Sequence, residues 1–247
     1  MRPVYARSVA DATVIKRASR YSEEEVINMQ EQKAGTIENI LKGNQPVPGC
    51  TISKQIYQSN GVTVFIFALA KGTSISAESY DYHKVISVYS GDLDIVTPGQ
   101  SDQHLTAGDS IITEVGVDVG VKTSTGCVYT EISLVKSAKI SASIKVGQPF
   151  KLDQLLPYQE EKIINLDLAD SPEMKFVVMS FGNGTGLPEH SAPGKAMIFG
   201  LHGSGTIVYE GQNNPIQSGE TFMMAKGAHH AVKAKDHYKM GLLVMKK

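Results

Sequence analysis

Residues 174–208 read "MKFVVMSFGNGTGLPEHSAPGKAMIFGLHGSGTIV" and repeat the pattern of residues 62–96, "VTVFIFALAKGTSISAESYDYHKVISVYSGDLDIV". When Gly72 is set over Gly184, Gly91 falls on Gly203. After a gap of a single residue, "AGDSIITEVGVDVGVK" (107–122) falls on "SGETFMMAKGAHHAVK" (218–233). Self-similarity of this kind marks a duplicated structural unit. The sequence therefore predicts two copies of one unit, residues 36–138 and 148–247, behind an N-terminal extension, residues 1–35.

Both copies consist of short runs rich in β-branched, aromatic and methionine residues, separated by Gly, Pro, Asn, Asp and Ser. Such spacing is typical of β-sandwiches and barrels, and predicts an all-β chain. The only predicted helix lies in "YSEEEVINMQEQK" (21–33), where Ser22 and Glu25 have the spacing of a capping box. Within the extension, "ATVIKR" (12–17) predicts a strand that covers a sheet edge, or packs across both units or onto a second subunit.

Composition excludes several classes of function. The chain has 24 Lys and Arg against 25 Asp and Glu, so net charge indicates no basic face for nucleic acid. No run approaches the roughly 18 apolar residues that span a bilayer, and no secretory leader is recognisable. We therefore expect a cytoplasmic protein, with Cys50 and Cys127 as buried free thiols. We expect a monomer or a homodimer, with neither nucleic acid nor membrane as a partner.

The glycines and histidines of the repeat resemble the two motifs of the cupin superfamily, G-x5-H-x-H-x(3,4)-E-x6-G and G-x5-P-x-G-x2-H-x3-N. In the second copy Gly184, His190 and Gly203 match the first motif, and Gly219, Gly227 and His230 match the second. The tandem arrangement resembles a bicupin, and the second copy resembles small uncharacterised bacterial cupins. The resemblance implies two tandem double-stranded β-helix (jelly-roll) barrels, each with a mouth suited to a divalent metal such as Mn, Fe, Ni or Zn.

The family's four ligand positions are only partly kept in the second copy. His190 and His230 occupy the first and last positions, but Ala192 occupies the second, and the acidic position falls on Ala196 or Met197. Two imidazoles alone bind a divalent metal weakly, so His190 and His230 are candidates for a metal site, a metal-free catalytic or binding site, or structural hydrogen bonding. Neighbouring residues on a strand face opposite sides. Glu189 and His229 are therefore not expected to replace a lost ligand, and neither is His202 at a predicted turn.

The first copy departs further from the motif. Glu78, Tyr80, Lys84 and Val119 occupy its four ligand positions, and His83 lies one residue out of register. We interpret the first barrel as having lost metal chemistry. The polar run "ESYDYHK" (78–84) either orients a polar ligand through hydrogen bonds or forms a solvated connection between strands.

An apolar pocket in the second barrel is predicted from Met197, Phe199 and Met224, although the same side chains also suit a simple core. Three functions follow. The first is the binding of a small polar metabolite, carbohydrate-like or an organic acid, with a weakly held divalent metal as an option. The second is a cupin enzyme that uses His190 and His230, either a metal-dependent dioxygenase or isomerase or a metal-free acid–base isomerase or lyase. The third is a non-catalytic scaffold, as in the storage proteins of the superfamily.

Overall fold

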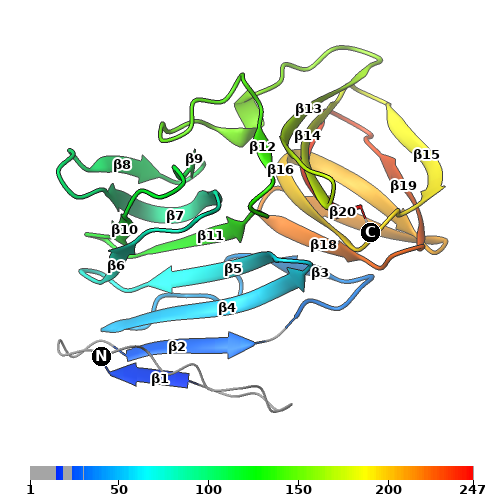
Figure 1. The fold of residues 1–247 in the computed structure, drawn as a ribbon. Helices are drawn as coiled ribbons and strands as arrows, with labels where there is room; N and C mark the ends of the chain where they lie inside the picture. Colours follow the sequence, from blue (N-terminus) through cyan, green and yellow to red (C-terminus); the bar gives the residue numbers. More distant parts are fainter. Residues whose placement is uncertain (1–14, 19–23, 30, 247) are drawn as a thin grey trace.

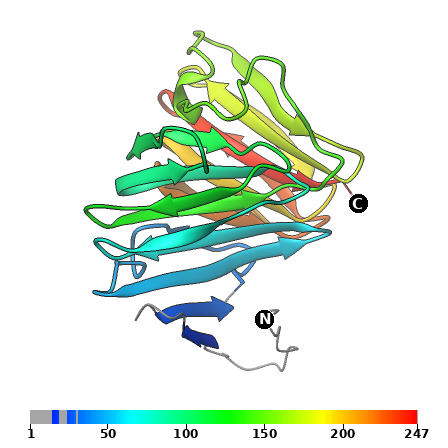
Figure 2. The same ribbon diagram turned by 60° about the vertical axis from the view of Figure 1, so that its left-hand side comes forward.

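The computed structural model describes residues 15–18, 24–29 and 31–246, which form two ten-stranded sheets and a single 3-10 turn, η1 (Leu152–Gln154). The first sheet follows the order β1-β2-β4-β5-β11-β7-β10-β6, with β8 and β9 paired to β7. Its strands are β1 (Ile15–Ala18), β2 (Glu24–Met29), β4 (Cys50–Ser59), β5 (Val62–Leu69), β6 (Ser74–Glu78), β7 (Lys84–Val96), β8 (Gln103–Thr106), β9 (Ser110–Ile112), β10 (Val119–Lys122) and β11 (Cys127–Ser133). Figure 2 shows these strands in succession, from blue β1 and β2 through cyan β4 and β5 to green β11.

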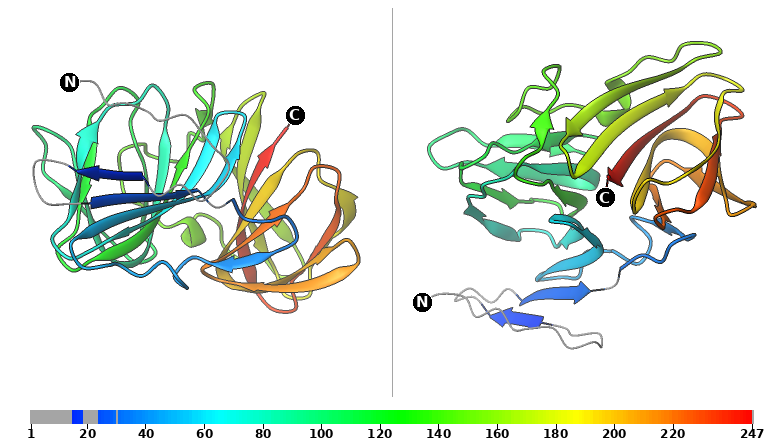
Figure 3. Two further views of the ribbon diagram at one scale, coloured as in Figure 1. Left: turned by 90° about the horizontal axis from the view of Figure 1, so that it is seen from below. Right: turned by 45° about the vertical axis from the view of Figure 1, so that its right-hand side comes forward.

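The second sheet follows the order β12-β13-β14-β20-β16-β18-β3, with β17 and β19 paired to β16 and β15 paired to β19. Its strands are β3 (Ile37–Asn39), β12 (Lys139–Ile140), β13 (Ile163–Asp170), β14 (Met174–Phe181), β15 (Gly186–Ser191), β16 (Ala196–Tyr209), β17 (Gln212–Gln217), β18 (Glu220–Met224), β19 (His229–Lys233) and β20 (Tyr238–Met245). Both sheets curl on themselves, and the two halves lie side by side (Figures 1 and 3).

The two halves repeat the same strand pairings. In the first half β5 pairs with β11, β11 with β7, and β7 with β9. In the second half β14 pairs with β20, β20 with β16, and β16 with β18, which are the strands that the sequence repeat equates with them. The long strands β7 and β16 each continue past a repeated glycine to pair with further strands of their own half. The predicted all-β jelly-roll architecture is confirmed.

The short segment at the start of each half pairs with a strand of the other half. β3 lies next to β18 of the second sheet, with Ile37 opposite Phe222, although the predicted boundary assigns residue 36 onward to the first unit. In return, Phe150 and Ser110 exchange backbone hydrogen bonds, so the segment before η1 lies against β9 of the first half. Each exchanged segment begins at a left-handed glycine, Gly35 (φ 77°) or Gly147 (φ 75°). Because of this exchange, no single boundary in the chain separates the backbone pairings of one half from those of the other.

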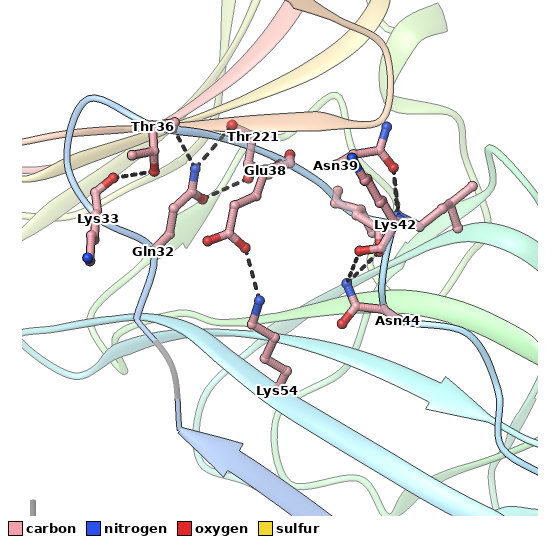
Figure 4. A network of polar contacts seen from close by, with 11 residues as sticks. Gln32, Lys33, Thr36, Glu38, Asn39, Lys42, Asn44, Lys54 and Thr221 are labelled. Atoms are coloured by element: carbon pink, nitrogen blue, oxygen red, sulfur yellow. Dashed lines mark hydrogen bonds and ion pairs between the residues drawn. The ribbon is translucent and has the colours of Figure 1, made fainter. Parts of the chain in front are cut away.

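A buried amide holds β3 in place (Figure 4). The Gln32 side chain is 3% exposed, and its Nε2 donates to the backbone oxygens of Thr36 and Thr221 at 2.8 and 3.2 Å. The Thr221 hydroxyl in turn donates to Gln32 Oε1 at 2.8 Å. Glu38 on β3 also pairs with Lys54 on β4 at 3.0 Å, which links the two sheets. Every polar atom of the buried amide thus has a partner, as burial requires.

Three apolar clusters make up the core. One lies within the first half, around Ile86, Ile95 and Tyr129, and another within the second half, around Ile198, Phe222 and Tyr238. The third and largest contains residues from both halves, with Ile56 and Val64 from the first and others from the second, including Phe176 and Leu243. Strand β16 is therefore apolar on both faces, with Met197 and Phe199 toward the shared cluster and Ala196 and Ile198 toward the core of its own half.

The N-terminal predictions have mixed outcomes. The predicted helix is wrong over residues 24–29, which form β2 and pair in parallel with β4. The pattern of Val26, Ile27 and Met29 is compatible with a helix or a strand. Pairing with the edge of the first sheet favours the strand. Ser22 lies outside the described residues. The predicted strand over 12–17 agrees with β1 from Ile15 onward, at the edge of the first sheet.

Two smaller expectations concern the thiols and the membrane. Cys50 and Cys127 are both free; Cys127 is buried, whereas Cys50 is only half-buried. Burial raises the pKa of the Cys127 thiol to about 12, so this side chain is a neutral part of the core. Within residues 15–18, 24–29 and 31–246, the structure contains no helix with the length and apolar character to cross a bilayer.

Candidate functional site

The two candidate histidines meet at one end of the second half. His190 on β15 lies directly opposite His230 on β19, and their ring centroids are 4.2 Å apart at an interplanar angle of 53°. A bulge in β15 between Leu187 and His190 makes this possible. Leu187 belongs to the apolar core of this half, and regular alternation would place Glu189 on its face. The additional residue places His190, rather than Glu189, opposite His230.

Backbone contacts determine which ring nitrogens remain available. Nδ1 of His190 lies 2.9 Å from the carbonyl oxygen of Pro188, and Nδ1 of His230 lies 3.3 Å from that of Ala228. Since a carbonyl only accepts, each Nδ1 carries a proton and donates, and each neutral ring keeps its lone pair on Nε2. The site therefore offers two imidazole Nε2 atoms, either as bases or as ligands.

Burial keeps His230 neutral. Its ring is 5% exposed, whereas His190 is exposed to solvent. Desolvation lowers the pKa of His230 below its ordinary value of 6.5, and the nearby His190 and His229 lower it further, while the bond to the Ala228 carbonyl opposes the shift. At neutral pH the pair thus consists of a buried neutral imidazole beneath a more accessible one.

The surrounding residues do not complete a metal site. Ala192 and Ala196, at two of the other ligand positions, carry no donor atoms and are 3% and 1% exposed. Across the described part of the chain, no three His, Cys, Asp or Glu side chains lie close enough together to hold a metal ion. A resident metal bound by the family's usual set of ligands does not fit this site.

Glu189, His229 and His202 do not add to the histidine pair. Glu189 Oε1 lies 4.0 Å from His229 Nδ1, and both side chains are 61% exposed. His202 lies in β16 rather than at the predicted turn, and its Nδ1 is 2.8 Å from the Tyr158 hydroxyl. None of these three side chains joins His190 and His230.

The predicted pocket residues belong to two different apolar clusters. Met197 and Phe199 belong to the core shared between the halves, whereas Met224 belongs to the core of the second half alone. Met197 and Phe199 both lie on β16 at even spacing, and so share one face, with Ala196 and Ile198 on the opposite face. All three predicted residues are at most 2% exposed. They pack in two different cores, and their role in a ligand pocket stays a prediction.

The equivalent mouth of the first half has a different chemistry. Glu78 on β6 lies opposite Val119 on β10, in the same register as His190 and His230. The Tyr80 hydroxyl donates to Glu78 Oε2 at 2.6 Å, and Lys84 Nζ lies 3.5 Å from the centroid of the Tyr80 ring. Lys84 also forms an ion pair with Glu131 on β11 at 2.9 Å.

Sequence reasoning missed Glu131, although the repeat contained a signal. The pairing of Cys127 with Gly91 and of Tyr238 with Gly203 equates Glu131 with Leu242. A carboxylate therefore stands where the second copy has an apolar side chain that packs against its core. A buried charge at such a position is found mainly where it has a partner, and Lys84 is that partner.

Comparison with solved structures identifies the architecture. A cupin 2 conserved barrel domain protein from Leptotrichia buccalis matches 87% of this chain and 98% of its own, with a TM-score of 0.77 and 23% sequence identity. The fold is that of the cupins. The His190–His230 pair thus lies at the mouth of a cupin-type half-barrel.

Other cupin-fold structures are more distant. Salicylate 1,2-dioxygenase from Pseudoaminobacter salicylatoxidans, in adducts with gentisate, is 10% identical, covers 74% of this chain and 68% of that chain, and has a TM-score of 0.57. The protein Ylba from E. coli is 11% identical, covers 79% of this chain and 83% of that chain, and has a TM-score of 0.56. No protein-family model matches the sequence, and no curated protein matches it significantly. At these identities the likeness concerns the fold.

Proposed function

We propose that the chain is a bicupin, with barrels at residues 36–138 and 148–247, whose second barrel binds a small organic acid between His190 and His230. The observation that supports this proposal is the imidazole pair with both Nδ1 atoms bonded to the backbone. Both rings are held by these bonds, so little rotational freedom is lost on binding. The cytoplasmic location and the oligomeric state remain predictions.

A carboxylate suits this pair because binding is coupled to protonation. An anion near Nε2 stabilises the imidazolium form and raises its pKa. His190 is the better candidate to take up the proton, since burial opposes a charge on His230. The ligand would then accept a charge-assisted hydrogen bond from one ring and, through a hydroxyl, donate to the neutral Nε2 of the other. A hydroxy acid presents both groups.

Thermal stabilisation by a set of acids tests the proposal. Acetate, lactate, malate and citrate are added to the wild-type chain and to the His190→Ala, His230→Ala and His229→Ala variants. A ligand that binds only the native state raises the unfolding midpoint. We expect a hydroxy acid to stabilise the wild type and the His229→Ala control, whose altered side chain faces outward, and to stabilise neither of the other variants. Equal stabilisation of all four proteins would place the ligand elsewhere.

Proton uptake provides an independent measurement. The chain is titrated with the hydroxy acid in a calorimeter near pH 7, once in phosphate and once in Tris. Comparison of the two buffers separates the heat of binding from the heat of buffer ionisation. We expect a net uptake of protons in the wild type that disappears in His190→Ala. Binding without any proton uptake would contradict the role of the imidazole pair.

An enzyme remains the alternative, since a solved structure with this fold is a dioxygenase. An imidazole pair with no third ligand among the described residues favours the metal-free version, in which His230 or His190 moves a proton at a carbon next to a carbonyl group. Loss of deuterium from the α-carbon of a bound acid, followed by NMR, distinguishes catalysis from binding. Elemental analysis of protein purified without a histidine tag tests the metal-dependent version.

A further inference from the structure

The first half contains a second cluster of polar and aromatic side chains. It lies at the mouth that corresponds to the histidine site of the second half. Four strands contribute to it: Phe65 on β5, Lys84 on β7 and Glu131 on β11 are half-buried, and Glu78 at the end of β6 is exposed. Glu131 lies opposite Phe65 on one side and Ile86 on the other, and Ile86 belongs to the interior core of this half. Tyr80, just beyond β6, closes the group by its contacts with Glu78 and Lys84.

Packing does not require an ion pair at this place. The repeat equates Lys84 with Ala196 and Glu131 with Leu242, and both of these side chains pack in the apolar core of the second half. The same fold is therefore built at these positions with small or apolar residues. Lys84 and Glu131 are only 13% and 15% exposed, so placing them here carries a desolvation cost that packing alone does not explain.

Half-buried aromatic residues lie near this ion pair: Tyr80 contacts Lys84, and Phe65 lies opposite Glu131. Phe65 and Phe67 follow one another on the inward face of β5, with ring centroids 5.8 Å apart, and Phe67 stacks on Tyr129 at 4.9 Å. Tyr80 and Tyr82 form a second pair at 5.2 Å. Phe65, Phe67, Tyr80 and Tyr82 are all half-buried, so apolar surface at this mouth faces solvent. Convergent polar groups among aromatic walls are the usual form of a small-molecule site.

The charges at this mouth favour a neutral ligand. Two carboxylates and a single ammonium give the cluster a net charge of about −1, which disfavours an anion. A cation is disfavoured as well, because the Lys84 ammonium already lies on the Tyr80 ring and against Glu131. The Tyr80 hydroxyl stays protonated, since burial raises its pKa and so does its bond to Glu78. It therefore acts as a donor to Glu78.

We propose that this mouth binds the edge of a planar cyclic amide, such as a pyrimidine or purine base. An ammonium has three donors, and Glu131 and the Tyr80 ring take two of them. The remaining N–H of Lys84 donates to the carbonyl of the amide, and the adjacent carboxylate of Glu131 accepts its N–H. The aromatic side chains Phe65 and Phe67 supply a wall for the flat ring.

Titration of the full chain with uracil, thymine and hypoxanthine tests this inference, with D-glucose and myo-inositol as neutral non-planar probes. Saturation-transfer NMR and calorimetry measure binding. We expect saturable binding of at least one of the three bases, and weaker or no binding of the two polyols. Absence of binding for all three bases, or tighter binding of a polyol, would overturn the proposal.

Substitutions of Phe65 and Glu131 test whether the base binds at this mouth. Phe65→Ala should weaken binding of the base by about tenfold, the usual effect of losing one aromatic contact. Glu131→Gln keeps the shape but changes the acceptor, and should weaken binding further. Since that change leaves Lys84 without its partner and endangers folding, Phe65→Leu serves as a second, milder variant with the same expected direction. Unchanged affinity in both Phe65 variants would overturn the assignment.

The matched control lies in the other half. His190→Ala should leave binding of the bases unchanged, and Phe65→Ala should leave stabilisation by organic acids unchanged. This pair of variants separates the failure of this inference from the failure of the proposed function. Loss of base binding in His190→Ala would contradict the inference.

Discussion

His230 illustrates how strand pairing turns an ordinary histidine into a buried neutral one. Its ring is 5% exposed, and its bond to the backbone leaves a single nitrogen available. The immediately preceding residue, His229, is 61% exposed on the other face of the strand. Adjacent residues of the same type therefore have different surroundings, and the lowered pKa of the buried His230 links its titration to stability.

The pH dependence of stability tests this difference. Because the folded-state pKa of His230 is lowered, its contribution to stability is present above the ordinary value of 6.5 and is lost as pH falls below it. We expect the free energy of unfolding, measured with urea, to fall between pH 7 and pH 5, and His230→Gln to flatten this fall. The His229→Gln control should follow the wild type. An identical pH slope in His230→Gln and the wild type would contradict the assignment.

A second prediction at this scale concerns the repeated glycines. Gly91 has φ 74°, and a Cβ built there would lie 1.9 Å from the backbone oxygen of Gly126. Gly72 has a similar φ of 77° but open space around it. We expect Gly72→Ala to cost about 1 kcal/mol through backbone strain alone, and Gly91→Ala to cost roughly 2 kcal/mol more through the clash. Thermal unfolding of both variants measures the difference, and equal losses would show that the clash relaxes.

Among the elements, β3 shows most clearly that pairing decides what a segment becomes. Three residues, Ile37–Asn39, join the sheet of the other half, and the buried Gln32 amide fastens the segment before them to Thr221. Hydrophobic periodicity does not reveal this arrangement, because the segment is short and half-buried. The strand that pairs with β3 is distant in sequence. Thr221 on that strand donates a hydrogen bond to the backbone oxygen of Glu38, which lies 183 residues earlier.

Removal of the amide tests the exchange. Gln32→Ala removes the 2.8 Å acceptor of the fully buried Thr221 hydroxyl and leaves it the longer 3.4 Å contact with the Glu38 oxygen, so this change should lower the free energy of unfolding by about 1–3 kcal/mol. Gln45→Ala is the matched control, because that amide is exposed and bonds only to the nearby Leu41 oxygen. It should change stability by less than about 0.5 kcal/mol. Urea denaturation measures both, and similar values would contradict a structural role for Gln32.

For the molecule as a whole, the largest core belongs to neither half. Residues of both halves, such as Val64 and Met197, belong to one cluster, and β3 and Phe150 cross between the halves. Loss of either half would expose the apolar side of this cluster and leave an exchanged segment unpaired. The two halves are therefore expected to fold together, although each repeats a complete set of strand pairings.

Calorimetry tests this coupling. We expect a single transition in which the calorimetric and van't Hoff enthalpies agree. Met197→Ala, in the shared core, should lower its midpoint without splitting it, at a cost of about 2–5 kcal/mol. The matched Met224→Ala change lies in the core of the second half and should act in the same direction. Two separate transitions in the wild type would contradict the coupling.

Sequence reasoning established the all-β class, the repeat, and His190 and His230 as the two histidines that lie opposite each other. These features are local: strand alternation and turn glycines are written within a few residues, and a duplication shows itself by comparing the chain with itself. The same reasoning was wrong about residues 24–29, because a polar, weakly amphipathic run suits a helix until a sheet edge is available. The pocket of Met197, Phe199 and Met224 stays a prediction, and the first two residues belong to a different cluster from the third.

Tertiary structure alone decided which residues share a site across distance. The bulge that places His190 rather than Glu189 opposite His230 depends on the pairing of β15 with β19, and the contact of Lys84 with Glu131 depends on the pairing of β7 with β11. The same holds for the shared core, since each face of β16 packs against a different half. Alternation shows that two residues face opposite sides, but only the packed fold decides what lies on each side.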